Sequence, residues 1–162
     1  MAELRRLFLG LGLKEVETFI ASGNVIFHSD AEDLRALALL IEGCLRRALS
    51  YEVSTFLRSA PELAAIAQYD PFSKSQLQFA QALNVAFLSE PPSPSARKLI
   101  MGLTSEIDEF QVHGREVYWL CRTRQSDSKF SNARFEKLLG TRATWRGRNT
   151  IAQMAAKYCA TS

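Results

Sequence analysis

The sequence has few of the residues from which metal and redox sites are built. Its three cysteines, Cys44, Cys121 and Cys159, are widely spaced and form no CxxC pair, so neither a zinc site nor a thioredoxin-like motif is predicted. The odd number argues against a disulfide framework, and we expect a reducing, cytoplasmic location. The two histidines, His28 and His113, have no companion at a metal-ligand spacing. We therefore predict no metal and no cofactor.

Other recognisable signals are also absent. No apolar run approaches the roughly 18 residues of a transmembrane helix, so no membrane partner is expected. The N-terminal residues have charges within their apolar run and lack a small-residue cleavage site, which argues against a signal peptide. Neither a Walker motif nor a dinucleotide-binding glycine motif occurs. The sequence leaves open whether the protein is an enzyme.

The composition is that of a globular protein with one strongly basic segment. The chain has 162 residues, of which 47% are apolar and 23% charged. Residues 1–112 carry a net charge of −4, whereas residues 113–150 contain nine Lys or Arg and only three Asp or Glu. A basic segment beside an acidic body favours an anionic partner. The alternative is a solvated surface that only keeps the protein soluble.

Hydrophobic periodicity and turn residues predict alternating helices and strands. Helices are expected at 3–9, 31–49, 95–103, 131–139 and 150–159, with a further short helix opened by Ser59, Pro61 and Glu62. Strands are expected at 16–21, 25–28, 53–57, 85–88, 108–112, 115–121 and 142–147. Ser29 with Glu32 fits a capping box, Ser93 fits an N-cap, and Gly140 fits a helix end.

The order of these elements predicts the fold class. The second half reads β-α-β-β-α-β plus a terminal helix, which is the ferredoxin-like order, and the first half reads the same without its first strand. We predict an α+β protein of two fused ferredoxin-like (alpha-beta plait) subdomains, with helices on one face of each antiparallel sheet. The first, incomplete subdomain is expected at 1–68, a linker at 69–82, and the second subdomain at 83–162.

An ordered set of motifs runs along nearly the whole chain: TFIASGNVIF (18–27), DPF (70–72), NVAFLSEPP (84–92), GREVYWL (114–120), SKFSN (128–132) and LLGTRATWRGRNT (138–150). This set resembles the bacterial family called domain of unknown function 1697. The resemblance implies two fused ferredoxin-like subdomains, but no reaction, cofactor or substrate. Members usually begin with an apolar strand and a glycine-rich loop, which this chain lacks. We expect direct strand pairing, or another chain or segment, to fill that gap.

The leading candidate site is the basic strand at 142–147. Arg142, Thr144, Arg146 and Arg148 share parity, so a regular strand would direct them to one face, with Trp145 on the other. Arginine forks suit phosphate and carboxylate groups. Single-stranded nucleic acid would also need an aromatic residue on the binding face. The alternative is an edge strand protected from aggregation by its charges.

Two further groups of residues are candidates. Asn149 and Thr150 open the last helix, whose N-terminus could bind an anion, although Asn149 could simply be an N-cap. Ser22 and Asn24 flank Gly23 and could present a hydroxyl and an amide to a ligand, although a hairpin turn also explains them.

Three functions are compatible with these residues. The first is a non-catalytic binding module for a phosphate-bearing ligand or single-stranded nucleic acid. The second is an enzyme acting on a small anionic metabolite in the groove between the halves. The third is a homo-oligomeric assembly protein, such as a homodimer, in which an incomplete sheet pairs with a second copy.

Overall fold

The computed structural model describes residues 2–19, 23–123 and 130–159. The chain divides into two compact units, Met1–Leu57 and Arg58–Ser162, which we call unit 1 and unit 2 and describe separately. The segment 69–82, expected to link two halves, lies within unit 2 and includes a short helix. The division comes earlier because Arg58 and the helix after it belong with the second sheet. No helix in the described residues is long and apolar enough to cross a membrane.

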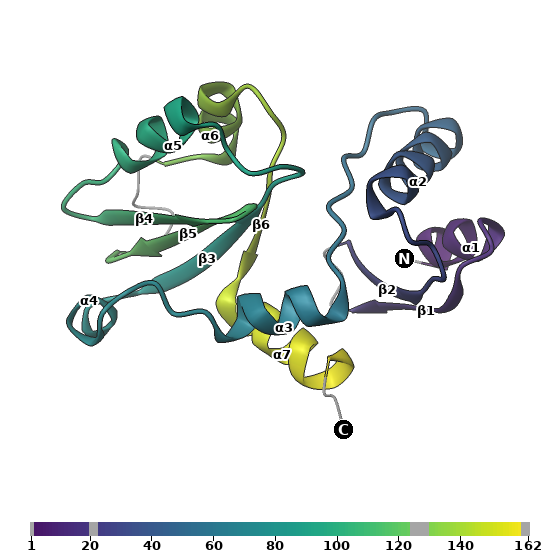
Figure 1. Ribbon diagram of the computed structural model, residues 1–162, viewed down its shortest axis with the longest axis horizontal. Helices are drawn as coiled ribbons and strands as arrows, with labels where there is room; N and C mark the ends of the chain where they lie inside the picture. The colour runs from purple at the N-terminus through teal and green to yellow at the C-terminus, as the bar shows by residue number, and fades with distance from the viewer. Residues whose placement is uncertain (1, 20–22, 124–129, 160–162) are drawn as a thin grey trace. The chain divides into compact units, whose positions relative to one another are not determined.

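Unit 1 has two helices on one side of a two-stranded antiparallel sheet (Figure 1). Its elements are α1 (Ala2–Gly10), β1 (Lys14–Phe19), β2 (Asn24–His28) and α2 (Leu34–Leu49). Both helices place apolar residues against the strands, where Phe8, Val16 and Ile41 are buried in one cluster. The Phe8 and Phe27 rings lie 5.6 Å apart across this core. The helices and hairpin of this unit agree with the sequence prediction.

Two local predictions for unit 1 are wrong. The N-cap of α2 is Asp33 and not Ser29, because the Asp33 carboxylate accepts a hydrogen bond from Ala36 N–H at 3.0 Å. The segment 53–57 is not a strand, although its ends pack on the core and its Thr55 N–H donates to Glu42. In the ferredoxin-like order this strand pairs with the first one, and the described residues of unit 1 include no such strand.

Unit 2 contains a four-stranded antiparallel sheet in the order β4-β5-β3-β6. Its strands are β3 (Ala82–Phe87), β4 (Asp108–His113), β5 (Glu116–Cys121) and β6 (Thr144–Gly147). Its helices are α3 (Ala60–Gln68), α4 (Lys74–Gln78), α5 (Pro94–Met101), α6 (Asn132–Leu139) and α7 (Arg148–Tyr158). From β3 to β6 the chain follows the predicted ferredoxin-like order, with β3 and β5 central.

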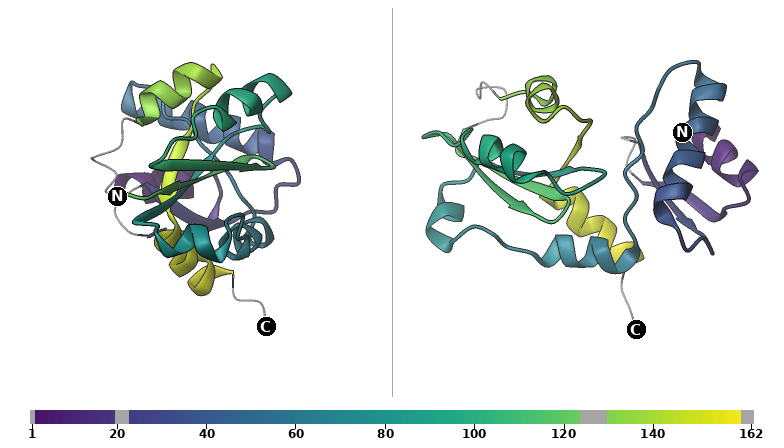
Figure 2. Two further views of the ribbon diagram at one scale, coloured as in Figure 1. Left: turned by 90° about the vertical axis from the view of Figure 1, so that its left-hand side faces the viewer. Right: turned by 45° about the horizontal axis from the view of Figure 1, so that its top comes forward.

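Helices cover both faces of the unit 2 sheet. Helices α5 and α6 lie on one side, as predicted, while α3 and α7 lie on the other (Figures 1 and 2). The first face packs Phe110, Trp119 and Phe135 into an aromatic core. Every residue of β5 is buried, so both faces of this central strand need a cover. The prediction of helices on one face therefore described only half of the arrangement.

Most helix ends and turns of unit 2 match their sequence signals. Ser59 and Ser93 are N-caps whose hydroxyls accept from N–H groups in the first turn, and Glu62 completes a capping box with Ser59. Gly140 ends α6 in the left-handed region with φ 69°. Gly114, with φ 58°, lies in the turn between β4 and β5. Each of these residues satisfies a backbone requirement that local sequence alone expresses.

Candidate anion-binding site

The predicted row of arginines is interrupted because the strand is short. Only Thr144 and Arg146 lie in β6, whereas Arg142 precedes it and Arg148 is the first residue of α7. Within the strand the parity argument holds, because Arg146 Nη1 donates to Thr144 Oγ1 at 2.9 Å. Strand β6 is also the edge of the sheet, so protection of that edge by Arg146 stays a prediction beside ligand binding.

The three arginines have different surroundings. Arg146 is half-buried and also donates to the Trp145 carbonyl oxygen at 2.9 Å, and its burial lowers the pKa of Arg146. Arg142 is exposed and does not line the hollow described below. Arg148 is half-buried and lies in an ion pair with Asp70, with Nη1 and Oδ1 separated by 3.5 Å. Of the three, Arg148 lines the hollow described below.

Trp145 lies on the opposite face, as its parity predicts. Its ring packs edge-on against Trp119 and Phe135, with centroids 5.6 and 5.1 Å away, and its Nε1 donates to Asn132 Oδ1. Because the Trp145 ring packs in the core of unit 2, it does not stack on a nucleic-acid base at the face that carries Arg146.

The start of α7 differs from the prediction. Its N-cap is Gly147, which has no side chain, and Asn149 is an exposed residue inside the first turn, followed by half-buried Thr150. The Asn149 cap prediction is wrong because β6 runs directly into the helix without an intervening loop. Gly147 offers no side-chain oxygen to cap α7. The first turn therefore lacks the acceptor that an N-cap side chain usually supplies.

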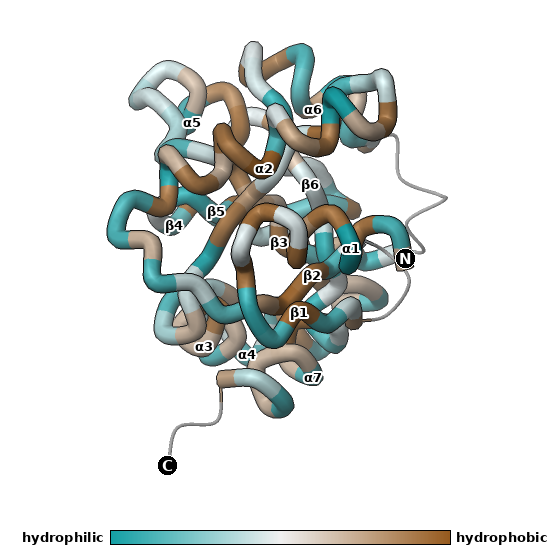
Figure 3. The backbone as a smooth tube through the Cα atoms, turned by 90° about the vertical axis from the view of Figure 1, so that its right-hand side faces the viewer, coloured by the Kyte–Doolittle hydropathy of each residue, from teal (hydrophilic) through white to brown (hydrophobic). Residues whose placement is uncertain are grey.

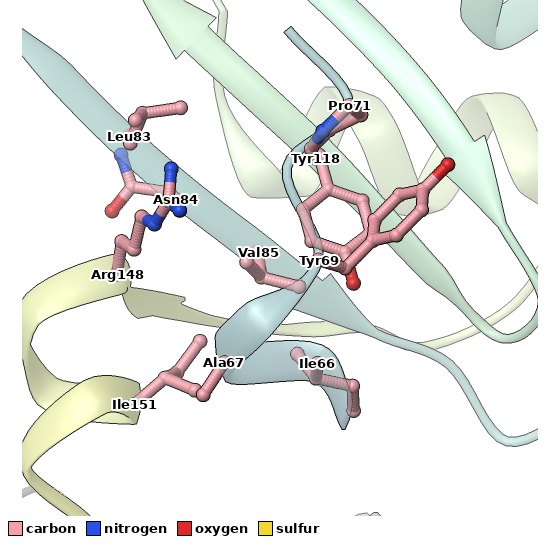
Figure 4. A pocket seen from close by; sticks show the side chains of 10 residues that line it. All are labelled: Ile66, Ala67, Tyr69, Pro71, Leu83, Asn84, Val85, Tyr118, Arg148 and Ile151. Carbon is pink, nitrogen blue, oxygen red and sulfur yellow. The ribbon is translucent and has the colours of Figure 1, made fainter. Parts of the chain in front are cut away.

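A hollow lies between this end of α7, the end of α3 and the central strands of the sheet (Figure 4). Its wall contains apolar side chains and four polar ones, and it is lined by Ile66, Ala67, Tyr69, Pro71, Leu83, Asn84, Val85, Tyr118, Arg148 and Ile151. In Figure 4, Arg148 and Asn84 lie on one side of Val85, and Tyr69 and Tyr118 lie on the other. Sequence reasoning missed Asn84 and Tyr118 as site residues.

Two buried side-chain groups of residues that line this hollow lack hydrogen-bond partners among the described residues. They are Asn84 Nδ2 and the Tyr118 hydroxyl, in residues only 9% and 4% exposed. The strand register puts them on opposite faces of the sheet, because Tyr118 pairs with Val85 whereas Asn84 pairs with Trp119 of the aromatic core. Buried polar atoms are nearly always paired, so an unpaired one requires an explanation such as a bound water or ion. Burial, helped by the negative charge of Glu116, raises the pKa of Tyr118, so its hydroxyl stays protonated and able to donate.

Asn84 connects the hollow to the start of α7. It pairs in register with Gly147 of β6, and a Cβ added to Gly147 would lie 3.7 Å from Asn84 Oδ1. The sequence contains a signal for Asn84, because Asn84 is the one polar residue in the apolar run LNVAF of a central strand. Tyr118 had no comparable signal, because a tyrosine in an apolar strand usually finds a partner for its hydroxyl.

The hollow is narrow in this conformation. The space that the centre of a water molecule can reach is about 10 Å³, which corresponds to roughly one water. A whole metabolite does not fit inside. A terminal oxygen of a larger ligand can enter while the rest of the ligand remains at the surface beside Arg148.

The remaining candidates from the sequence lie in unit 1. Ser22 is outside the described residues. Asn24 is buried, and its Nδ2 donates to the Phe19 carbonyl oxygen at 3.1 Å across the hairpin. This bond supports the hairpin explanation for Asn24.

Comparisons with known proteins agree with the resemblance noted in the sequence. A family model described as "Protein of unknown function (DUF1697)" matches residues 1–118. Among solved structures, conserved bacterial protein SP0830 from Streptococcus pneumoniae is similar, with a TM-score of 0.66 and 23% identity over 96% of this chain and 88% of that one. At this identity the likeness shows the fold alone. No curated protein matches the chain.

Proposed function

Since the chain belongs to the DUF1697 family of proteins of unknown function, we propose a role from the geometry of unit 2: it is a non-catalytic module that binds a small phosphate-bearing ligand. The observation that carries this proposal is the unpartnered, buried Tyr118 hydroxyl in the hollow that Arg148 also lines. Both groups offer hydrogen-bond donors, so together they favour a ligand with several acceptor oxygens.

A phosphate group meets these requirements. One oxygen enters the hollow toward the Tyr118 hydroxyl, and the outer oxygens face the Arg148 guanidinium, which binds phosphate through parallel hydrogen bonds. The uncapped first turn of α7, at Asn149 and Thr150, favours the same negative charge. Arg142 and Arg146 add positive charge along this edge of unit 2 and attract the ligand from a distance.

Asp70 competes for Arg148 in the absence of ligand. A separation of 3.5 Å is longer than the 2.7–2.9 Å of a charge-assisted hydrogen bond, and both side chains are partly exposed. Such a pair contributes little, so an incoming anion can replace the Asp70 carboxylate. The surroundings of Trp145 make single-stranded nucleic acid the weaker candidate ligand, because its ring belongs to the opposite face.

Calorimetric titration of the full chain with inorganic phosphate, pyrophosphate and a nucleoside triphosphate tests the proposal. Arg148→Gln should weaken the tightest binder at least about tenfold, since charged hydrogen bonds contribute roughly 1.5–3 kcal/mol. Asp70→Asn should tighten binding because it removes the competing carboxylate. Arg134→Gln is the matched control, since Arg134 is exposed on α6, which covers the other face of the sheet. Equal losses in the two arginine variants would indicate non-specific attraction and contradict the proposal.

Tyr118→Phe separates a ligand site from an ordinary buried water. The hydroxyl has no hydrogen-bond partner among the described residues, so its removal should leave the stability of unit 2 unchanged or raise it. If the hydroxyl contacts the ligand, the same variant should bind about threefold or more weakly. Unchanged affinity in this variant, or no saturable binding of any of the three phosphates, would refute the assignment.

A further inference from the structure

Helix α2 exposes leucines on the side opposite its core face. Leu37, Ile41 and Leu45 are buried against the unit 1 strands. Leu39 and Leu40, by contrast, are 64% and 51% exposed. In Figure 3 the brown stretches of the tube along α2 mark its apolar residues. A helix that needs only one apolar face to pack its own unit normally carries polar residues on the other.

Three exposed apolar residues and a half-buried glycine form a stripe along α2. Ala36, Leu39, Leu40 and Gly43, which we call the outer stripe, follow the i, i+3, i+4, i+7 spacing of one helix face. The only side chain within 4 Å of a Cβ built on Gly43 is that of Arg47, one turn further along. Two small residues at the ends of the stripe and two leucines at its centre allow another helix to approach closely.

Charges of opposite sign lie beyond the two ends of the outer stripe. Glu32 and Asp33 precede or cap the N-terminus of α2, and Arg46 and Arg47 are exposed in its last turn. Neither arginine forms an ion pair with another described residue. Acidic residues therefore precede the outer stripe and basic residues follow it. When two copies of α2 are placed antiparallel, the acidic end of each copy lies beside the basic end of the other.

We propose that the outer stripe is the contact surface for a second copy of this chain, with the two α2 helices packed antiparallel about a two-fold axis near Leu39 and Leu40. In this register Leu39 meets Leu40 of the partner subunit, and Ala36 meets Gly43 of the partner subunit. Glu32 and Asp33 then lie beside Arg47 and Arg46 of the partner subunit, respectively. An isologous contact of this kind closes into a dimer.

The charge order excludes the parallel alternative. Parallel helices would bring the Arg46–Arg47 pairs of both copies together and place the acidic ends together as well, which is repulsive at both ends. Antiparallel packing also aligns the two helix dipoles favourably. One pair of helices of this length makes an interface at the small end of the usual range, so we expect a dimer that dissociates on dilution.

Sedimentation equilibrium of the full chain over a wide concentration range tests the stoichiometry. The native protein should show a monomer–dimer equilibrium, and Leu39→Glu should weaken it at least about tenfold. Leu99→Glu is the matched control, because Leu99 is also an exposed leucine on a helix, but on α5 of unit 2. A monomer at every concentration, or equal weakening by both variants, would overturn the proposal.

Charge reversal tests the antiparallel register. Glu32→Arg and Arg47→Glu should each weaken the dimer several-fold, because each places like charges together across the two-fold axis. The double variant restores both pairs in reversed polarity and should regain most of the lost affinity. A double variant as weak as the sum of the two single changes would overturn the antiparallel pairing, even if the protein were a dimer.

Discussion

Replacing Glu116 by Gln is expected to destabilise unit 2 strongly, because it leaves a buried arginine without its counter-charge. Arg58 Nε and Glu116 Oε2 are 2.8 Å apart, and the two side chains are only 5% and 10% exposed. Arg58 Nη2 also donates to the Leu88 carbonyl oxygen at 2.7 Å, and its guanidinium lies over the Phe87 ring. These contacts hold the arginine in place whether or not the carboxylate is present.

The magnitude follows from how completely the pair is desolvated. Removing one member of a buried ion pair costs about 3–5 kcal/mol, because the other charge remains in a poorly solvated place. Gln keeps the shape of Glu116 and one hydrogen-bond acceptor, so we expect about 3 kcal/mol, at the lower end. The double change Arg58→Met with Glu116→Leu removes both charges and should cost clearly less than the sum of the single changes.

Urea unfolding followed by tryptophan fluorescence measures this loss in unit 2 alone. The chain has two tryptophans, and both Trp119 and Trp145 lie in or against the aromatic core of unit 2. With an m-value of about 2 kcal/mol per M, a loss of about 3 kcal/mol lowers the midpoint by roughly 1.5 M. Arg115→Gln is the control, since its pair with Glu62 is more exposed and should contribute less than about 1 kcal/mol.

A small effect would refute the reasoning. If Glu116→Gln lowers the midpoint no more than Arg115→Gln does, then the Arg58 pocket is solvated and the pair is not the buried contact described here. If the double variant is as unstable as the two single changes added together, the charges do not interact in the folded protein. Either result would also weaken the account of why Arg58 belongs to unit 2.

Two further predictions use the same assay. Burial raises the pKa of Glu62, but hydrogen bonds from Ser59 N–H and Arg115, together with the charge of Arg115, outweigh it and hold the net pKa below its usual value. The stabilisation by ionised Glu62 is therefore complete above the unfolded-state pKa and is lost as the pH falls through the folded-state pKa. In Glu62→Gln the urea midpoint should therefore fall less steeply in acid than in the native protein. Parallel plots of midpoint against pH for the two proteins would contradict this. Gly140→Ala should cost about 1 kcal/mol because φ is 69° there, whereas Gly102→Ala, at a helix end with φ −70°, should lower the midpoint less.

The parts of the fold that follow from local physics were predictable from the sequence. Ser59, Ser93 and Gly140 satisfy backbone groups within a few residues, so their roles could be read without knowing the rest of the chain. The strand at 53–57 failed for the opposite reason. Strands need a partner, and sequence periodicity does not say whether the partner is present. The second pair of helices on the unit 2 sheet was likewise unpredictable, because only tertiary packing decides which helix covers which face.

The sequence predicts part of the candidate site. It does not predict the contacts between residues that are distant in the chain. Sequence parity correctly separated Trp145 from Arg146, since alternation within a strand is a local property. The importance of Asn84 and Tyr118 depends on the absence of partners for their polar atoms, which no pattern along the chain expresses. In the sequence, Asp70 stood out only as part of the DPF motif (70–72), because its position beside Arg148 arises from the packing of distant segments.

The change from strand to helix at Gly147 decides which kind of anion the site favours. Had the strand continued, Arg142, Arg146 and Arg148 would form a row along one face, and a long polyanion could follow it. Instead, Arg148 begins α7 and lines a hollow with Asn84 and Tyr118, while Arg142 stays outside it. The Arg148 and Tyr118 donors therefore belong to one hollow rather than extending along a line. A ligand that concentrates its charge in a single terminal group, as a phosphate ester does, matches this arrangement better than a chain of phosphates separated by sugars.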